Sequence, residues 1–297
     1  MKTPLLSHNE LTSIHQRVLA SKTRQAVATT FAAGQHLSQH RGQGVELEDS
    51  RPYHQGDDIR HMNWRATARN GKATMKVFRE ERQRNLYLIV DKTQTMAFGT
   101  RTTLKANAAA TAAAIFAFSS IAHHESVAGI VIDEQAKHYA PTRSMEQAFE
   151  LIHAIAAPMQ TPCNAFWYRP ETEPLLANLE QQTRQGSTII LISDFIGLNT
   201  KHQRLIRQLA QKRQLFAIHV SDPAEESMSN LGKLRLYSPL TQQYHIVDTH
   251  DANVREKFSE QMKHTKRTLH TFFSRCNTPL HPLSTQYDVF SQLEHSW

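Results

Sequence analysis

The sequence predicts an α/β fold in which a mostly parallel β-sheet is flanked by helices. Continuous apolar runs at residues 86–90, 188–192 and 215–220 are typical of strands buried on both faces. Segments with apolar residues at helical spacing lie between these runs. Such alternation is the pattern of parallel βαβ units, so we expect helices on both faces of one sheet.

The sequence predicts two parts, an N-terminal extension at residues 1–85 and an α/β domain at residues 86–297. Within the extension, residues 1–35 place apolar side chains at roughly helical spacing. Residues 60–68 and 72–79 are predicted to form a β-hairpin, because an Asn-Gly dipeptide between them is a strong two-residue turn signal.

The α/β domain continues with an alanine-rich helix at 103–123 and a strand at 127–132 that pairs with residues 137–140. Ser144 is predicted to cap the next helix, with Gln147 completing a capping box. The remaining predicted elements are helices at 144–156, 171–184 and 201–212, an antiparallel hairpin at 233–237 and 243–247, a long helix at 251–276, and a short strand near Leu280 before a last helix.

Composition indicates a globular protein, since 39% of the 297 residues are hydrophobic and 21% are charged. Cys163 and Cys276 lie far apart and in no pairing motif, which favours a reducing compartment over a disulfide framework. Neither the N-terminus nor the alanine-rich stretch at 106–122 is apolar enough for a signal peptide or a membrane span. We therefore expect a cytoplasmic protein without membrane insertion.

The formal net charge of +7 allows an acidic partner such as nucleic acid, an anionic lipid or an acidic protein face. The basic residues are dispersed, however, and their densest clusters lie at residues 79–84 and 263–267. No RRM or KH signature accompanies them. The interpretation that we favour is a basic surface without a polyanion partner.

Two of the predicted buried strands end in aspartate-containing motifs. Asp91, Thr93 and Thr95 form an Asp-x-Thr-x-Thr array after the first strand, and Asp194 follows a later one. Carboxylate and hydroxyl oxygens from one loop could converge on a hard cation such as magnesium. Strand-end aspartates also cap helices or tighten turns, and Lys92 could offset negative charge there, so both interpretations stay open.

A second constellation, in residues 51–69, combines arginines, aspartates and aromatic residues. Its prominent members are Tyr53, Gly56, Asp57, Asp58, Arg60, Trp64, Arg65 and Arg69. Asp57 and Asp58 could pair with the arginines in bidentate contacts. We favour an ion-pair network that pins the extension to the α/β core, and the alternative is a recognition surface for a partner protein.

The chain resembles the domain-of-unknown-function family fifty-eight. The resemblance rests on these motifs: Arg41-Gly42-Gln43-Gly44-Val45-Glu46, Tyr53-x-x-Gly56-Asp57-Asp58-Ile59-Arg60, Asn63-Trp64-x-Ala66-Thr67-Ala68-Arg69, Lys76-Val77-Phe78-x-Glu80-Glu81, and Ser193-Asp194-Phe195. It implies a von Willebrand A-like fold in the α/β domain. It also implies partnership with MoxR-type AAA+ ATPases, beside whose genes bacterial family members are commonly encoded, and with other von Willebrand A proteins.

The resemblance implies roles for the strand-end residues as well. The metal-ion-dependent adhesion site of von Willebrand A domains consists of an Asp-x-Ser-x-Ser motif, a separate threonine and a separate aspartate. By resemblance, Asp91, Thr93 and Thr95 match the motif, and Asp194 matches the separate aspartate. Thr161 is the candidate for the separate threonine. Both hydroxyl positions carry threonine where serine is usual, which adds a methyl group to each. Such a site holds magnesium and completes its coordination with a carboxylate from the partner.

The sequence lacks a phosphate-binding loop, a dinucleotide fingerprint and a nucleophile elbow. We therefore expect a protein-binding adaptor or co-chaperone and not an enzyme, acting with a MoxR-type ATPase in the assembly or activation of other proteins. The alternatives are a metal-dependent hydrolase built on Asp91 and Asp194, and a nucleic-acid-binding protein.

Overall fold

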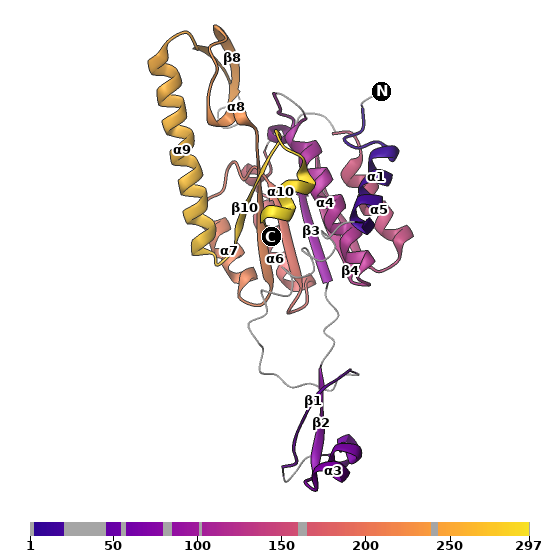
Figure 1. Ribbon diagram of the computed structural model, residues 1–297. Coiled ribbons are helices and arrows are strands. Elements are labelled where there is room, and N and C mark those ends of the chain that lie inside the picture. The colour runs from indigo at the N-terminus through magenta and orange to yellow at the C-terminus, as the bar shows by residue number, and fades with distance from the viewer. Residues whose placement is uncertain are drawn as a thin grey trace. The chain divides into compact units, whose positions relative to one another are not determined.

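The computed structural model describes residues 3–20, 46–54, 58–79, 85–100, 103–159, 165–238 and 243–296 (Figure 1). It divides into two compact units. The larger unit comprises Met1–Gly34 and Arg84–Trp297, and the smaller comprises Gln35–Gln83.

A six-stranded sheet forms the centre of the larger unit, in the order β10-β7-β6-β3-β4-β5 (Figure 1). The strands are β3 (Asn85–Asp91), β4 (Ser126–Ile132), β5 (Ala136–Thr142), β6 (Thr188–Ser193), β7 (Gln214–Ser221) and β10 (Leu280–Ser284). Each neighbouring pair is parallel except β4 and β5. The predicted mostly parallel sheet is therefore confirmed, and β5 pairs with β4 as expected.

The order of the strands places a topological switch point between β3 and β6. Counted along the chain, β3 is the first strand of this sheet and β6 the fourth, and the connections leave toward opposite edges from this pair. In doubly wound sheets, ligands bind in the crevice at the carboxyl ends of the strands at such a point. The ends of β3 and β6 are therefore where the fold favours a site.

Helices cover both faces of the sheet and bury two separate apolar clusters. The first face carries α1 (His8–Ala20), α4 (Lys105–Ala122), α5 (Met145–Ala156) and α10 (Val289–Ser296). The second face carries α6 (Thr172–Gln182), α7 (Thr200–Ala210) and the C-terminal part of α9 (Ala252–Arg275). Helix α4 is buried along nearly its whole length, because its many alanines allow close approach of the sheet and of other helices. Within the described residues, no helix is long and apolar enough to cross a membrane.

Helix α1 belongs to the larger unit. Leu11, Ile14 and Val18 recur at helical spacing, are buried, and join the apolar cluster around α4. The division of the chain thus differs from the predicted boundary at residue 85, since the first helix packs with the α/β core and the smaller unit is an insertion after it.

The smaller unit corrects the predicted hairpin. Its elements are β1 (Glu46–Pro52), η1 (Ile59–His61), α3 (Trp64–Asn70) and β2 (Thr74–Arg79). The hairpin prediction was wrong because residues 64–70 form a helix, and β2 pairs antiparallel with β1 instead. The Asn63 side chain accepts a hydrogen bond from the Ala66 N–H, and Gly71 ends the helix at φ 65°. Gly71 therefore serves as a left-handed helix cap and not as a hairpin turn.

The later elements follow the prediction with one correction. Strands β8 (Lys233–Ser238) and β9 (Gln243–Asp248) form the expected antiparallel hairpin, and η2 (Gln94–Met96), η3 (Phe166–Tyr168) and α8 (Pro223–Glu226) are short additions. Ser144 precedes α5, but its side chain makes no capping hydrogen bond. Gln147 Oε1 accepts instead from Thr142 Oγ1 at 2.6 Å, so the predicted capping box was wrong.

The packing of α1 predicts that its buried face stabilises the larger unit. Leu11→Ala should lower the free energy of unfolding by about 2–5 kcal/mol, because a leucine that is 3% exposed leaves a cavity when truncated. Leu19, in the same helix, is 51% exposed, and Leu19→Ala should change stability by about 0.5 kcal/mol or less. Urea unfolding of the two variants tests this, and equal small effects would show that α1 does not dock.

Candidate functional site

Polar side chains gather at the switch point, where β3 and β6 end. Val90 is aligned with Ile192 in the parallel pair, so Asp91 and Ser193 come next on adjacent strands. Thr93 and Thr95 lie in the turn after β3, and Lys105 is the first residue of α4. We call Asp91, Thr93, Thr95, Ser193, Asp194 and Lys105 the edge cluster.

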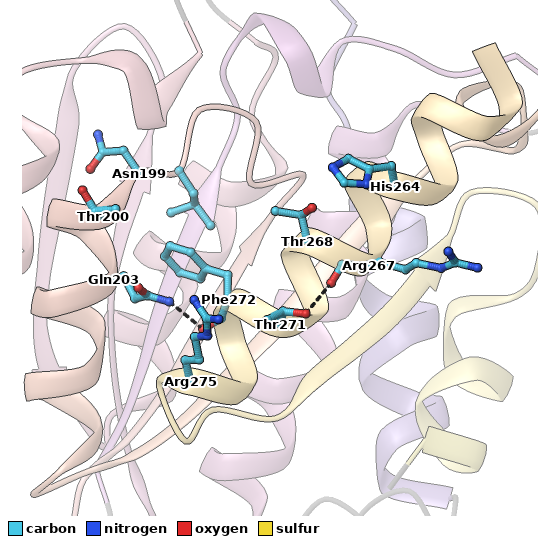
Figure 2. A pocket seen from close by; sticks show the side chains of 10 residues that line it. Asn199, Thr200, Gln203, His264, Arg267, Thr268, Thr271, Phe272 and Arg275 are labelled. Atoms are coloured by element: carbon cyan, nitrogen blue, oxygen red, sulfur yellow. Dashed lines mark hydrogen bonds between the residues drawn. The ribbon is translucent and has the colours of Figure 1, made fainter. Parts of the chain in front are cut away.

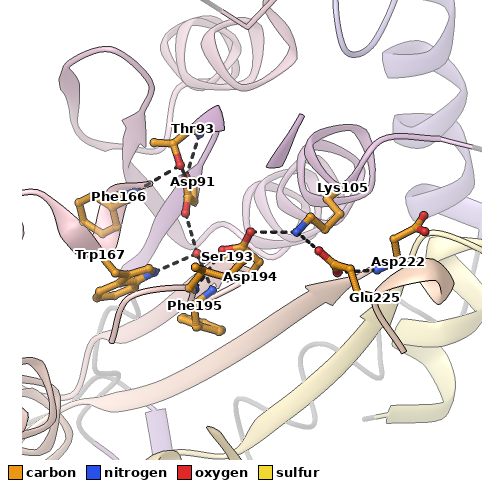
Figure 3. Close-up of polar contacts among 11 residues, drawn as sticks. Asp91, Thr93, Lys105, Phe166, Trp167, Ser193, Asp194, Phe195, Asp222 and Glu225 are labelled. Atoms are coloured by element: carbon orange, nitrogen blue, oxygen red, sulfur yellow. Dashed lines mark hydrogen bonds and ion pairs between the residues drawn. The ribbon is translucent and has the colours of Figure 1, made fainter. Parts of the chain in front are cut away.

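Asp91 is held by hydroxyl and amide donors. Its Oδ1 accepts hydrogen bonds from the Thr93 N–H at 2.9 Å and from Thr93 Oγ1 at 2.7 Å. Its Oδ2 accepts from Ser193 Oγ at 2.6 Å (Figure 3). The carboxylate is 2% exposed, so these contacts fix its orientation out of bulk solvent.

Ser193 links Asp91 to a group of packed aromatic residues that contains Trp167 and Phe195. The sequence alone did not indicate that Ser193 contributes to the site. Its Oγ accepts from Trp167 Nε1 at 2.9 Å and from the Phe195 N–H at 3.0 Å while it donates to Asp91. Phe195 has a φ of 57°, a left-handed conformation that bulky residues rarely adopt. Its ring packs between Trp167 and Phe273, with centroid distances of 5.7 and 4.7 Å.

Asp194 makes an ion pair with a buried lysine that the sequence analysis missed. Lys105 Nζ lies 2.9 Å from Asp194 Oδ2 and 2.6 Å from Glu225 Oε1 (Figure 3). A cation at the first turn of a helix is opposed by the helix dipole, so Lys105 depends on these partners. Burial disfavours its charged form, but Asp194 and Glu225 outweigh burial and raise the pKa of Lys105.

The cluster carries an excess of negative charge. Lys105 pairs with Asp194 and with Glu225, which adjoins the cluster, whereas Asp91 has no ion-pair partner among the described side chains. His219 lies nearby, but burial lowers its pKa to about 4 and leaves it neutral at pH 7. Burial, and then the charge of Asp194, raise the pKa of Asp91 to about 6, although hydrogen bonds from Ser193 and Thr93 oppose the shift.

Thr95 carries a polar atom without a partner. Its Oγ1 is buried and makes no hydrogen bond within the described structure, whereas the Thr93 hydroxyl donates to Asp91 and accepts from the Phe166 N–H. An unpaired buried hydroxyl is costly and calls for an explanation such as an ion or a water. Its oxygen and the excess of carboxylates are hard donors of the kind that magnesium prefers.

The residues thus fit a divalent cation, provided that hydroxyls contribute. Within the described residues, no three histidine, cysteine or acidic side chains form a group that could hold a metal alone. Lys92 does not lie against the array, because its Nζ donates to the carbonyl oxygens of Ala154 and Ala157 at the end of α5. Burial lowers the pKa of Lys92 to about 8. The predicted Thr161 lies outside the described residues.

The second predicted constellation is exposed in the smaller unit. Among its members, Gly56 and Asp57 lie outside the described residues. Asp58 Oδ1 accepts from the Arg60 N–H at 3.0 Å as a cap of η1. Across the described range 58–79, no ion pair joins Asp58 to the exposed arginines Arg60, Arg65 and Arg69, where the sequence analysis expected one.

The aromatic members of this constellation are also accessible. Trp64 is 64% exposed and Tyr53 is 36% exposed. Aromatic and basic side chains are therefore accessible within the smaller unit itself, and both interpretations of this constellation stay predictions.

Comparison with known proteins identifies relatives of unknown function. The family model described as "Protein of unknown function DUF58" matches residues 49–268. The uncharacterized proteins Rv1480 of Mycobacterium tuberculosis and Mb1516 of Mycobacterium bovis are each 26% identical over 264 residues, which cover 88% of this chain and 81% of theirs.

Solved structures show weaker similarity. The conserved hypothetical protein BatB from Bacteroides thetaiotaomicron has a TM-score of 0.43 at 8% identity, covering 72% of this chain and 96% of that one. A von Willebrand factor type A protein from Catenulispora acidiphila has a TM-score of 0.34 at 13% identity, covering 61% and 43%. Similarities of this size do not establish a shared function.

The raised pKa of Asp91 predicts a pH-dependent loss of stability when divalent cations are chelated. A carboxyl whose folded pKa is about 6 stabilises the fold fully below its unfolded pKa of about 3.9, and this contribution is lost as the pH rises through 6. Between pH 5 and 7.5 the loss should be about 1 kcal/mol larger in the wild type than in Asp91→Asn, which lacks this titrating group.

Urea unfolding at both pH values measures this difference. Asp58→Asn, which changes an exposed carboxylate, is the control and should retain the wild-type pH dependence. Equal pH dependence in the wild type and Asp91→Asn would contradict the assignment.

Proposed function

The chain belongs to the DUF58 family of proteins of unknown function, and we propose that it is a protein-binding adaptor or co-chaperone of a MoxR-type AAA+ ATPase. Other von Willebrand A proteins would be further partners in the assembly or activation of client proteins. The observation that best supports binding at the edge cluster is the buried Thr95 hydroxyl, which has no hydrogen-bond partner among the described residues and lies in the turn that follows Asp91.

Asp91, Thr95 and Asp194 would hold a magnesium ion, with Thr93 available as a further oxygen donor. When bound, the ion supplies an open coordination position that suits a carboxylate from the partner. Thr93 and Ser193 orient the Asp91 carboxylate through hydrogen bonds. Lys105 holds one oxygen of Asp194 and leaves the other, which accepts from the Ile196 N–H, with capacity for a further contact.

The chemistry of His219, which lies near Asp194, and of Cys276, which contacts α7, favours binding over catalysis. Burial lowers the pKa of His219 to about 4, which makes it a weak general base at pH 7. Burial raises the pKa of the Cys276 thiol to about 11, so little reactive thiolate forms. These properties support the proposal that the chain acts as a binding protein and not as a hydrolase.

The proposal predicts magnesium-dependent capture of the ATPase. Affinity-tagged wild-type chain, purified from cells that express its native operon, should recover a MoxR-type ATPase in magnesium and less of it in EDTA. Thr95→Val should weaken recovery at least about tenfold, because one coordinating oxygen is lost. Its fold should remain intact, because the Thr95 hydroxyl makes no hydrogen bond to any residue that the structure describes.

Glu146→Ala, which removes an exposed carboxylate from α5, is the matched control and should behave as the wild type. Recovery of no ATPase would overturn the adaptor proposal. The role of the edge cluster would be overturned if the wild type recovered as much ATPase in EDTA as in magnesium and Thr95→Val recovered as much as the wild type.

A further inference from the structure

A groove separates the N-terminus of α7 from the C-terminal half of α9. Figure 2 shows the side chains that line it. Its volume is about 450 Å³. Two hydrogen bonds across its base fix the helices to each other. Gln203 Nε2 donates to the Phe272 carbonyl oxygen at 3.4 Å, and the Cys276 thiol donates to the Gln203 carbonyl oxygen at 3.5 Å. The groove is therefore built from two tethered helices of the larger unit.

The two helix segments that form the groove are basic and contain no acidic residue. Helix α7 and residues 261–275 of α9 contribute these cations: Lys201, Arg204, Arg207, Lys263, Lys266, Arg267 and Arg275. Lys201 pairs with Glu173 at 3.3 Å and Lys266 with Glu226 at 2.8 Å. Within the described residues, no carboxylate pairs with Arg267 or Arg275, which both line the groove.

Apolar side chains line the same groove. Leu198 and Phe272 are half-buried there, and the Phe272 ring lies between the two helices in Figure 2. Phe272 and His264 carry the two rings among the lining residues, and half-buried Phe272 lies in the floor of the groove, so the lining offers no row of exposed rings for stacking successive bases. A guanidinium recognises a carboxylate through two parallel hydrogen bonds, and the apolar floor suits an aliphatic side chain.

We propose that this groove docks an acidic segment of a partner protein. The carboxylates of the segment bind Arg267 and Arg275, and an apolar side chain between them packs against Leu198 and Phe272. The surface is separate from the edge cluster and requires no metal, so it does not depend on the proposed function.

Fluorescence anisotropy with a labelled peptide tests the proposal at about 150 mM salt, where surface charges are screened beyond roughly 8 Å. The probe is Glu-Glu-Leu-Glu-Glu, with Gln-Gln-Leu-Gln-Gln and Glu-Glu-Ser-Glu-Glu as comparison peptides. The wild type should bind the probe more tightly than either comparison peptide.

The double substitution Arg267→Gln and Arg275→Gln should weaken binding of the probe at least about tenfold, because two charged hydrogen-bonding groups are lost. Both side chains are exposed, so the melting temperature should not change. Arg184→Gln with Lys212→Gln removes the same charge from exposed positions outside the groove and should weaken binding less than about threefold.

Three results would overturn the proposal. The first is absence of binding to the probe, and the second is equal weakening by the two double substitutions, which would indicate unspecific attraction. The third is tighter binding of a single-stranded oligonucleotide that displaces the probe, which would assign the groove to nucleic acid.

Discussion

The buried ion pair of Lys105 with Asp194 and Glu225 is the interaction on which the carboxyl edge of the sheet depends. It ties the first turn of α4 to the end of β6 and to α8, three segments far apart in the sequence. Removing one partner of a buried ion pair typically costs about 3–5 kcal/mol, because the remaining charge is stranded. The ion pair therefore fixes the position of the Asp194 carboxylate. The negative charge of Asp194 in turn contributes to the raised pKa of Asp91.

Much of the fold follows from local sequence, whereas the cluster follows from tertiary contacts. The apolar runs that become β3, β6 and β7 identify parallel strands, and parallel strands place Asp91 and Asp194 at one edge. The position of Lys105 could not be predicted, because a lysine beginning an alanine-rich helix ordinarily faces solvent. The sequence also could not show that the Thr95 hydroxyl lacks a partner, since Thr93 and Thr95 occupy equivalent hydroxyl positions in the Asp-x-Thr-x-Thr array.

In the smaller unit, the local sequence is compatible with more than one structure. Asn70 and Gly71 satisfy both a hairpin turn and a helix ending, and local sequence does not choose between them. The pairing of β2 with β1, together with the Asn63 cap, selects the helix. Likewise, charge alternation around Asp58 indicates ion pairs, yet Asp58 serves as a cap and Trp64 is exposed. Exposed aromatic and basic side chains in a family motif are typical of recognition surfaces.

The larger unit thus carries two chemically different features, a buried carboxylate-containing cluster at the edge of the sheet and a basic groove between α7 and α9. The most direct test of the edge is anomalous diffraction from crystals of the chain soaked in manganese, which replaces magnesium at hard oxygen sites. We predict an anomalous peak bounded by Asp91, Thr95 and Asp194, and its loss in Thr95→Val. An ordered edge cluster without a peak at saturating manganese would contradict the assignment and leave these residues as turn and capping groups.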